Sequence, residues 1–225
     1  SDMTAFLFDL DGTLADTMPS HQQAWNALFP ALGVTVDEAD FFHWSAGLTN
    51  REIFPRLLGR ALDDTELTEW SARKEALYRE IYRPKMAEVA GASAWLDRLT
   101  QAGRSCAVGT AAPPENAAMV LDGLNLRRYF RAVVGGADIQ HGKPRPEVFL
   151  RAAERLGVPS EAYSRCVVFE DAPAGIEAAF RAGMRCVVVT TSLRAEDVGA
   201  LPNHRHVLFA INDFRDERLL GLLQV

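Results

Sequence analysis

The stretch AFLFDLDGTL, residues 5–14, sets the fold that this sequence predicts. Residues 5–10 form a short apolar run that ends in an acid, the pattern of a buried strand whose carboxyl end enters a site. Asp9 and Asp11 are two residues apart where this strand stops, and Gly12 permits a tight turn. Both carboxylates can therefore reach one pocket, although acids and glycine also follow strands simply as turn formers.

Three later apolar runs resemble the first, at residues 106–110, 166–170 and 186–190. Helical patterns lie between them, at residues 93–101, 114–121, 147–156 and 174–181. Alternating continuous apolar strands and helices predict an α/β fold with a parallel, doubly wound sheet. Such sheets bind ligands outside the carboxyl ends of their strands, where the acids and hydroxyls of this sequence fall.

Residues 18–87 interrupt this alternation. They contain helical patterns at residues 21–29, 52–58 and 66–82 and no convincing apolar strand. An insertion of this size after the first strand is typical of a cap over the site, the alternative being helices that extend the core. We therefore expect a catalytic core at residues 1–17 and 88–225 and a helical cap domain at residues 18–87.

The composition is that of a globular protein, with 48% hydrophobic and 24% charged residues among 225. A net charge of -6 argues against a nucleic-acid partner, but a small anionic substrate stays compatible with it. No run approaches the ~18 apolar residues that span a bilayer, and no signal-peptide pattern opens the chain. We expect a cytoplasmic protein, a monomer or weak dimer without a membrane partner, whose three cysteines are buried and reduced.

A second acidic pair, Glu170 and Asp171, follows the apolar run at residues 166–170 and precedes a helical pattern. Acids at a helix N-terminus also occur for their interaction with the helix dipole alone. Together with Asp9 and Asp11, however, up to four carboxylates would meet at adjacent strand ends, where they stay ionised only with a cation among them. Oxygen ligands without nearby thiols favour magnesium over zinc.

Two further segments supply groups that bind anions. Thr110, in GTAAP at residues 109–113, combines a hydroxyl with free backbone N–H groups, or serves only as a helix cap. Lys143, in GKPRPE at residues 142–147, lies beside two prolines that stiffen its backbone, or is an exposed loop lysine. Acids, hydroxyl and lysine at strand ends form the set of groups that phosphoryl transfer requires.

These segments together resemble the haloacid dehalogenase superfamily, in the branch of beta-phosphoglucomutase and small-metabolite phosphatases. Four signatures carry the resemblance over essentially the whole chain: FDLDGTLADT from Phe8, VGTAAP with Thr110, GKPRPEVF with Lys143, and FEDAPAGIEAA from Phe169. The resemblance implies a Rossmann-like core with an inserted helical cap domain, in agreement with the pattern along the chain.

The resemblance also implies roles for the site residues. Asp9 would attack phosphorus to form an aspartyl-phosphate, and Asp11 would protonate the leaving oxygen and then activate water. Because family dehalogenases lack the second acid, Asp11 argues against dehalogenation. The implied phosphate-binding groups are Thr110, the backbone N–H groups of Leu10 and Ala111, and Lys143. The implied Mg²⁺ ligands are Asp9, the backbone carbonyl of Asp11, Asp171, and Glu170 either directly or through water.

In the cap, the resemblance to beta-phosphoglucomutase extends to His21, Trp25 and Lys74. His21 would assist proton transfer or contact the substrate, or it is an ordinary surface histidine. Trp25 fits the cap core better than a substrate platform. Lys74 would reach a phosphate from the cap, or it is a solvated helix lysine.

The segment GLTNRE, residues 47–52, departs from the mutase pattern. Asn50 falls where the mutase has an arginine that holds a second phosphate, and Arg51 is displaced from it by about 100° on a helix. Asn50 and Arg51 are candidate substrate residues of the cap, with His21, Trp25 and Lys74. Asparagine does not replace a bidentate arginine. We therefore favour a Mg²⁺-dependent phosphatase that hydrolyses a small phosphorylated metabolite such as a sugar phosphate. A sugar phosphomutase is the alternative, and a non-catalytic sugar-phosphate sensor ranks third because Asp9 and Asp11 are both present.

Overall fold

A computed structural model describes residues 3–224 of the chain, so residues 1, 2 and 225 of the expected core range lie outside the described residues. Within this part, six strands form one sheet in which every neighbouring pair is parallel. The sheet order is β3-β2-β1-β4-β5-β6. The strands are β1 (Ala5–Phe8), β2 (Ser105–Gly109), β3 (Ala132–Val134), β4 (Cys166–Glu170), β5 (Arg185–Val189) and β6 (Val207–Ile211).

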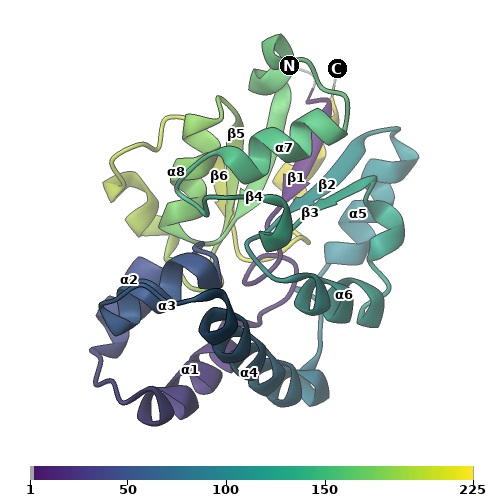
Figure 1. Cartoon of the computed structure of the whole chain (residues 1–225). Helices are drawn as coiled ribbons and strands as arrows, with labels where there is room; N and C mark the ends of the chain where they lie inside the picture. The colour runs from purple at the N-terminus through teal and green to yellow at the C-terminus, as the bar shows by residue number, and fades with distance from the viewer. Residues whose placement is uncertain (1–2, 225) are drawn as a thin grey trace.

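From β1 to β5 an α-helix lies between successive strands, with a further group of four helices between β1 and the helix before β2 (Figure 1). A 3-10 helix lies between β5 and β6. The group of four comprises α1 (Met18–Leu32), α2 (Glu38–Ser45), α3 (Asn50–Leu58) and α4 (Asp64–Tyr82). The others are α5 (Ala92–Gln101), α6 (Pro114–Gly123), α7 (Glu147–Arg155) and α8 (Pro173–Arg181). Short 3-10 helices lie at Arg83–Lys85, Arg127–Tyr129, Gly136–Asp138, Ser160–Arg165, Ala195–Ala200 and Glu217–Leu223.

Apolar side chains cover both faces of the sheet, as a parallel sheet requires. Successive residues of a strand point to opposite faces, so Phe6 and Phe8 pack with α5 and α6 while Ala5 and Leu7 pack with α7 and α8. The doubly wound α/β fold that the sequence predicts is confirmed.

The sheet register brings the polar strand ends to one level. Phe8 of β1 is paired with Val108 of β2 and with Phe169 of β4. The residues that follow β1, β2 and β4 therefore leave the sheet side by side. They lie where the strand order changes direction, between β1 and β4. Ligands of doubly wound sheets bind at this switch point, and the acids of the sequence lie there.

Helices α1–α4 gather beyond this edge of the sheet, below it in Figure 1. They have a core of their own, whose buried members are Trp25, Leu28, Phe29, Phe41, Ile53 and Phe54. The two connections to the sheet run together, because Val89 N–H donates to the Leu14 carbonyl at 2.8 Å. We propose residues 18–87 as a cap domain on the strength of this separate core.

Three elements of the structure are absent from the sequence prediction. Strand β3 has three residues, too few to stand out as an apolar run. Strand β6 is the continuous apolar run VLFAI at the other edge of the sheet, and the sequence-based prediction did not include it. Helix α2 is short and rich in aromatic residues, which have modest helix propensity. It forms because the Asp37 carboxylate caps the Asp40 N–H at 2.9 Å and Phe41 is buried in the cap core.

Over residues 3–224, none of the helices combines the length and the apolar character needed to cross a bilayer.

The three cysteines should be unreactive in the folded protein. Burial raises the pKa of Cys106 to about 12 and that of Cys166 to about 11, and it raises the pKa of Cys186 well above its usual value. Because the thiolate is the reactive form, a chromogenic disulfide reagent should label none of them at neutral pH and all three in denaturant. Rapid labelling of the native protein would contradict this burial.

Candidate active site

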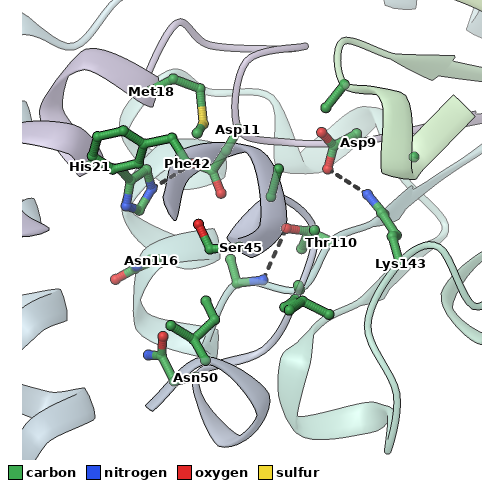
Figure 2. Close-up of a pocket in the computed structure, with 18 of the residues that line it drawn as sticks. Asp9, Asp11, Met18, His21, Phe42, Ser45, Asn50, Thr110, Asn116 and Lys143 are labelled. Atoms are coloured by element: carbon green, nitrogen blue, oxygen red, sulfur yellow. Dashed lines mark hydrogen bonds and ion pairs between the residues drawn. The ribbon is translucent and has the colours of Figure 1, made fainter. Parts of the chain in front are cut away.

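Asp9 lies at the centre of the polar strand ends. Its backbone N–H donates to the Phe169 carbonyl at 3.0 Å, which extends the contact between β1 and β4 by one residue. Its Oδ1 accepts a hydrogen bond from the Lys143 Nζ at 2.8 Å (Figure 2). The strand and the lysine together give this buried carboxylate one fixed orientation.

Gly12 lets the loop after β1 approach β4. Its φ is +83°, and a Cβ at this position would overlap the Asp171 carboxylate. The neighbouring Thr13 is buried, and its hydroxyl donates to Asp171 Oδ1 at 3.0 Å. The glycine and the threonine therefore hold the two acidic segments against each other.

Three buried carboxylates, those of Asp9, Glu170 and Asp171, each place an oxygen within 4.8 Å of the other two. Burial and the charges of Asp9 and Glu170 raise the pKa of Asp171 well above its usual value. Burial and Asp9 also raise the pKa of Glu170 to about 7, against the opposing effect of Lys143. The three carboxylates therefore repel one another, and a further cation among them would reduce this repulsion.

Lys143 is the cation that the structure places in this cluster. Its Nζ lies 2.6 Å from Glu170 Oε2 and 3.2 Å from the Gly109 carbonyl, besides its contact with Asp9. Burial alone lowers a lysine pKa, but Asp9 and Glu170 raise the pKa of Lys143 above its ordinary value. Lys143 is thus a buried ammonium and not an exposed loop lysine.

The cluster suits a divalent metal ion. Three carboxylates and one ammonium leave a net charge of about -2 when all are ionised, which one Mg²⁺ would neutralise with the oxygen ligands it prefers. Asp11 is not part of this carboxylate group; the prediction that concerns its backbone carbonyl stays a prediction. Both oxygens of Glu170 already accept hydrogen bonds, Oε2 from Lys143 and Oε1 from the Asp171 N–H at 3.1 Å, so direct ligation by Glu170 would share an oxygen with one of these donors.

Asp11 points toward the cap helices. Its Oδ1 accepts hydrogen bonds from the Thr17 hydroxyl at 2.6 Å and the His21 Nε2 at 3.2 Å. Burial would raise the pKa of Asp11, but His21, Thr17 and Lys74 outweigh burial and hold it below its usual value. The structure therefore presents Asp11 as a carboxylate beside the nucleophile candidate.

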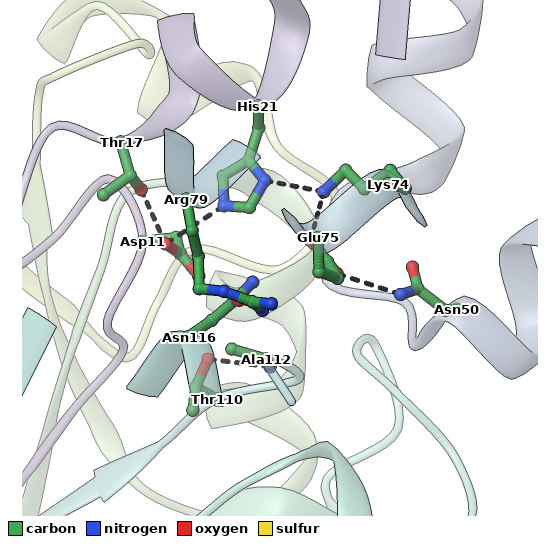
Figure 3. Close-up of polar contacts among 10 residues, drawn as sticks. All are labelled: Asp11, Thr17, His21, Asn50, Lys74, Glu75, Arg79, Thr110, Ala112 and Asn116. Carbon is green, nitrogen blue, oxygen red and sulfur yellow. Dashed lines mark hydrogen bonds and ion pairs between the residues drawn. The ribbon is translucent and has the colours of Figure 1, made fainter. Parts of the chain in front are cut away.

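His21 continues this chain of contacts into the cap (Figure 3). Its Nδ1 lies 2.7 Å from the Lys74 Nζ. Because an ammonium can only donate, Nδ1 accepts, and a neutral His21 then carries its proton on Nε2 and donates it to Asp11. The ring also stacks on Tyr78, with 3.6 Å between ring centroids, so His21 is not an ordinary surface histidine.

Lys74 is buried and paired rather than solvated. Its Nζ lies 2.7 Å from Glu75 Oε1, and the other carboxylate oxygen of Glu75 accepts from Asn50 Nδ2 at 2.9 Å (Figure 3). Trp25 packs against Phe41 and Phe54 in the cap core, in agreement with the expectation, and its ring also lies 5.1 Å from the Lys74 Nζ.

Arg51 departs from its expected place at the substrate. Its Nη2 donates to the Ile139 carbonyl at 2.8 Å, and Arg51 is not among the residues that line the pocket. The helical rotation between neighbours explains this, since Asn50 faces the pocket and Arg51 therefore faces the loop of the core. Arg51 contacts the catalytic core and not the substrate cavity.

Thr110 is buried at the end of β2, where its hydroxyl accepts from the Ala112 N–H at 3.1 Å. Thr110 and Ala111 both line the pocket. Leu10 does not line it, and its side chain belongs to the core. The prediction for Leu10 concerns its backbone N–H alone and stays a prediction.

One pocket brings these groups together between the sheet edge and the cap (Figure 2). The cavity volume is about 130 Å³, and the cavity is open to solvent on one side. The predicted residues that line it are Asp9, Asp11, His21, Trp25, Asn50, Lys74, Thr110, Ala111, Lys143, Glu170 and Asp171.

Sequence reasoning missed Thr13, Thr17, Glu75 and Asn116. Thr13 and Thr17 stand in the quoted signature FDLDGTLADT, so their closeness to Asp9 and Asp11 was an available signal. Glu75 and Asn116 lie within helices among many other polar residues, and no spacing distinguishes them.

Comparison with known proteins agrees with this geometry. A family model described as haloacid dehalogenase-like hydrolase matches residues 3–183. The fructose-1-phosphate phosphatase YqaB of Escherichia coli is 34% identical over 194 residues, which cover 81% of this chain and 94% of the relative. A beta-phosphoglucomutase of Mycobacterium bovis is 34% identical over 231 residues, covering 90% of this chain and 86% of the relative.

The fold is shared with solved structures as well. The crystal structure of a beta-phosphoglucomutase from Clostridium difficile superposes with a TM-score of 0.81 at 23% identity, covering 98% of this chain and 96% of the other. At this identity the likeness concerns the fold alone.

Substitution of Gly12 tests the close approach of the loop to Asp171. Gly12→Ala should lower the free energy of unfolding by about 1–3 kcal/mol more than Gly33→Ala, measured by urea denaturation. Both glycines have a positive φ, but a Cβ at Gly33 meets nothing within 4 Å. Equal losses in the two variants would contradict the contact with Asp171.

Proposed function

Because the chain belongs to the haloacid dehalogenase-like hydrolase family, we propose that it is a Mg²⁺-dependent phosphatase of a small sugar phosphate. The observation that carries the proposal is the Asp9 carboxylate, held by Lys143 at 2.8 Å within a buried acidic cluster that lines the pocket. A relative that is a fructose-1-phosphate phosphatase supports the substrate class.

In the first half-reaction, a carboxylate oxygen of Asp9 attacks phosphorus, and the bond from phosphorus to the leaving oxygen breaks. The leaving oxygen takes a proton from Asp11. Asp11 is a carboxylate in the structure, but an incoming phosphate dianion repels its charge and so favours the protonated form. Thr110 and Lys143 line the pocket on the side of Asp9 and would hold the phosphoryl oxygens.

In the second half-reaction, Asp11 takes a proton from water, whose oxygen attacks phosphorus as the bond to Asp9 breaks. Free phosphate leaves, and the Asp9 carboxylate is restored. Thr17 and His21 orient Asp11 throughout, because both contact its Oδ1. When bound by Asp9, Asp171 and Glu170, Mg²⁺ would offset the charge that gathers on the phosphoryl group.

A phosphomutase is the second candidate, because a beta-phosphoglucomutase is among the relatives. Of the described residues that line the pocket, the lysines are Lys74 and Lys143, and both are paired with carboxylates. A mutase intermediate carries two phosphates and needs a second cationic clamp. Because both of these lysines are already paired, neither is available to hold a second phosphate, and this supports hydrolysis.

Replacing the nucleophile tests the proposal. Asp9→Asn should lower phosphate release from sugar phosphates about 10³-fold or more, since an amide oxygen is a poor nucleophile, while circular dichroism stays unchanged. Asp16→Asn, an exposed neighbour, should keep its activity. Substantial turnover by Asp9→Asn would refute attack by Asp9. Formation of an isomeric sugar phosphate instead of inorganic phosphate by the unsubstituted protein would favour the mutase.

Metal removal tests the magnesium assignment. A strong chelator should abolish phosphate release, because the acidic cluster is then left with Lys143 as its counter-charge, and excess Mg²⁺ should restore it. Chelator already saturated with Mg²⁺ serves as the control and should have no effect. Phosphate release that continues in excess free chelator would remove Mg²⁺ from the proposal.

A further inference from the structure

The wall of the pocket that the cap contributes carries a buried ion pair, Lys74 with Glu75 (Figure 3). Lys74 is 3% exposed and Glu75 is 6% exposed, and both line the pocket. The second oxygen of Glu75 is held by Asn50. The charges of this wall therefore cancel, and the Lys74 ammonium is not free to bind an anion.

A neutral wall with a fixed carboxylate disfavours a second phosphate. An anionic group placed there would lose its hydration and would face the Glu75 carboxylate without an unpaired cation in return. A like charge in a desolvated site acts as a repulsive element against the wrong ligand. Glu75 thus works against bisphosphates, in addition to the absence of an arginine at position 50.

Asn116, on helix α6, is among the residues that line the pocket. Arg79 Nη1 lies 2.8 Å from Asn116 Oδ1, and since a guanidinium only donates, this contact fixes the orientation of the amide. Asn116 Nδ2 is buried and has no hydrogen-bond partner among residues 3–224. A buried donor without a partner destabilises the protein, because it has lost its hydrogen bond to water. A ligand that supplies an acceptor would remove this cost.

Donor and acceptor groups without net charge suit hydroxyl groups, which both donate and accept. We propose, on the basis of the phosphatase function proposed above, that Glu75, Asn50 and Asn116 select a phosphate monoester whose leaving group is an uncharged polyhydroxy compound. Glu75 is the residue that excludes a second phosphate. The substrate class is thus a sugar or sugar-alcohol monophosphate, and sugar bisphosphates are rejected.

The test compares phosphate release from a hexose 1-phosphate and from the corresponding 1,6-bisphosphate. The unsubstituted protein should prefer the monophosphate by about tenfold or more in kcat/KM. Glu75→Gln keeps the size of the side chain but leaves Lys74 unneutralised, so this preference should fall by about tenfold. Glu69→Gln, an exposed position on the same helix, should keep the full preference.

Equal use of the two hexose esters by the unsubstituted protein would overturn the inference without any variant, even if Glu75→Gln does not fold. A folded Glu75→Gln protein with unchanged preference would overturn the assignment to Glu75. The small ester 4-nitrophenyl phosphate separates the two proposals. Hydrolysis of 4-nitrophenyl phosphate and of both hexose esters at equal rates refutes this inference alone, whereas no phosphate release from any ester refutes the phosphatase function.

Discussion

The contact of the Lys143 ammonium with Asp9 and Glu170 is the interaction on which the site depends. It joins the ends of β1 and β4 to the loop before α7, three segments far apart in the chain. The two carboxylates are buried and could not stay ionised together without this cation. The same contact orients Asp9 and leaves the acidic cluster with the charge that suits one divalent metal ion.

A second chain of contacts extends from the core into the cap. It runs from Asp11 through His21 and Lys74 to Glu75 and Asn50. The residue proposed as acid and base is thus oriented by a cap histidine, which links the proposed chemistry to the cap through direct contacts. On the cap side of the pocket, the Lys74 ammonium is paired with Glu75, and Glu75 is also held by Asn50. Lys74 is therefore not available to bind a second phosphate.

Sequence reasoning predicted the strands that are apolar on both faces, since burial on two sides gives a continuous run. It missed the edge strand β3, which has three residues, and the edge strand β6, although VLFAI is a continuous apolar run. It also missed α2, which depends on its packing in the cap. In the site, it found the residues at strand ends and misplaced Arg51, whose side chain contacts the Ile139 carbonyl instead of the pocket.

The sequence by itself determined the four central strands of the sheet and the set of groups around Asp9, because parallel strands bring their carboxyl ends to one edge whatever lies between them. Only the tertiary structure decided which cap residues line the pocket. Adjacent helix positions point about 100° apart, so the pairing of Glu75 with Asn50 depends on how α3 and α4 dock against each other. That docking rests on aromatic packing among distant segments, and no local spacing in the chain encodes it.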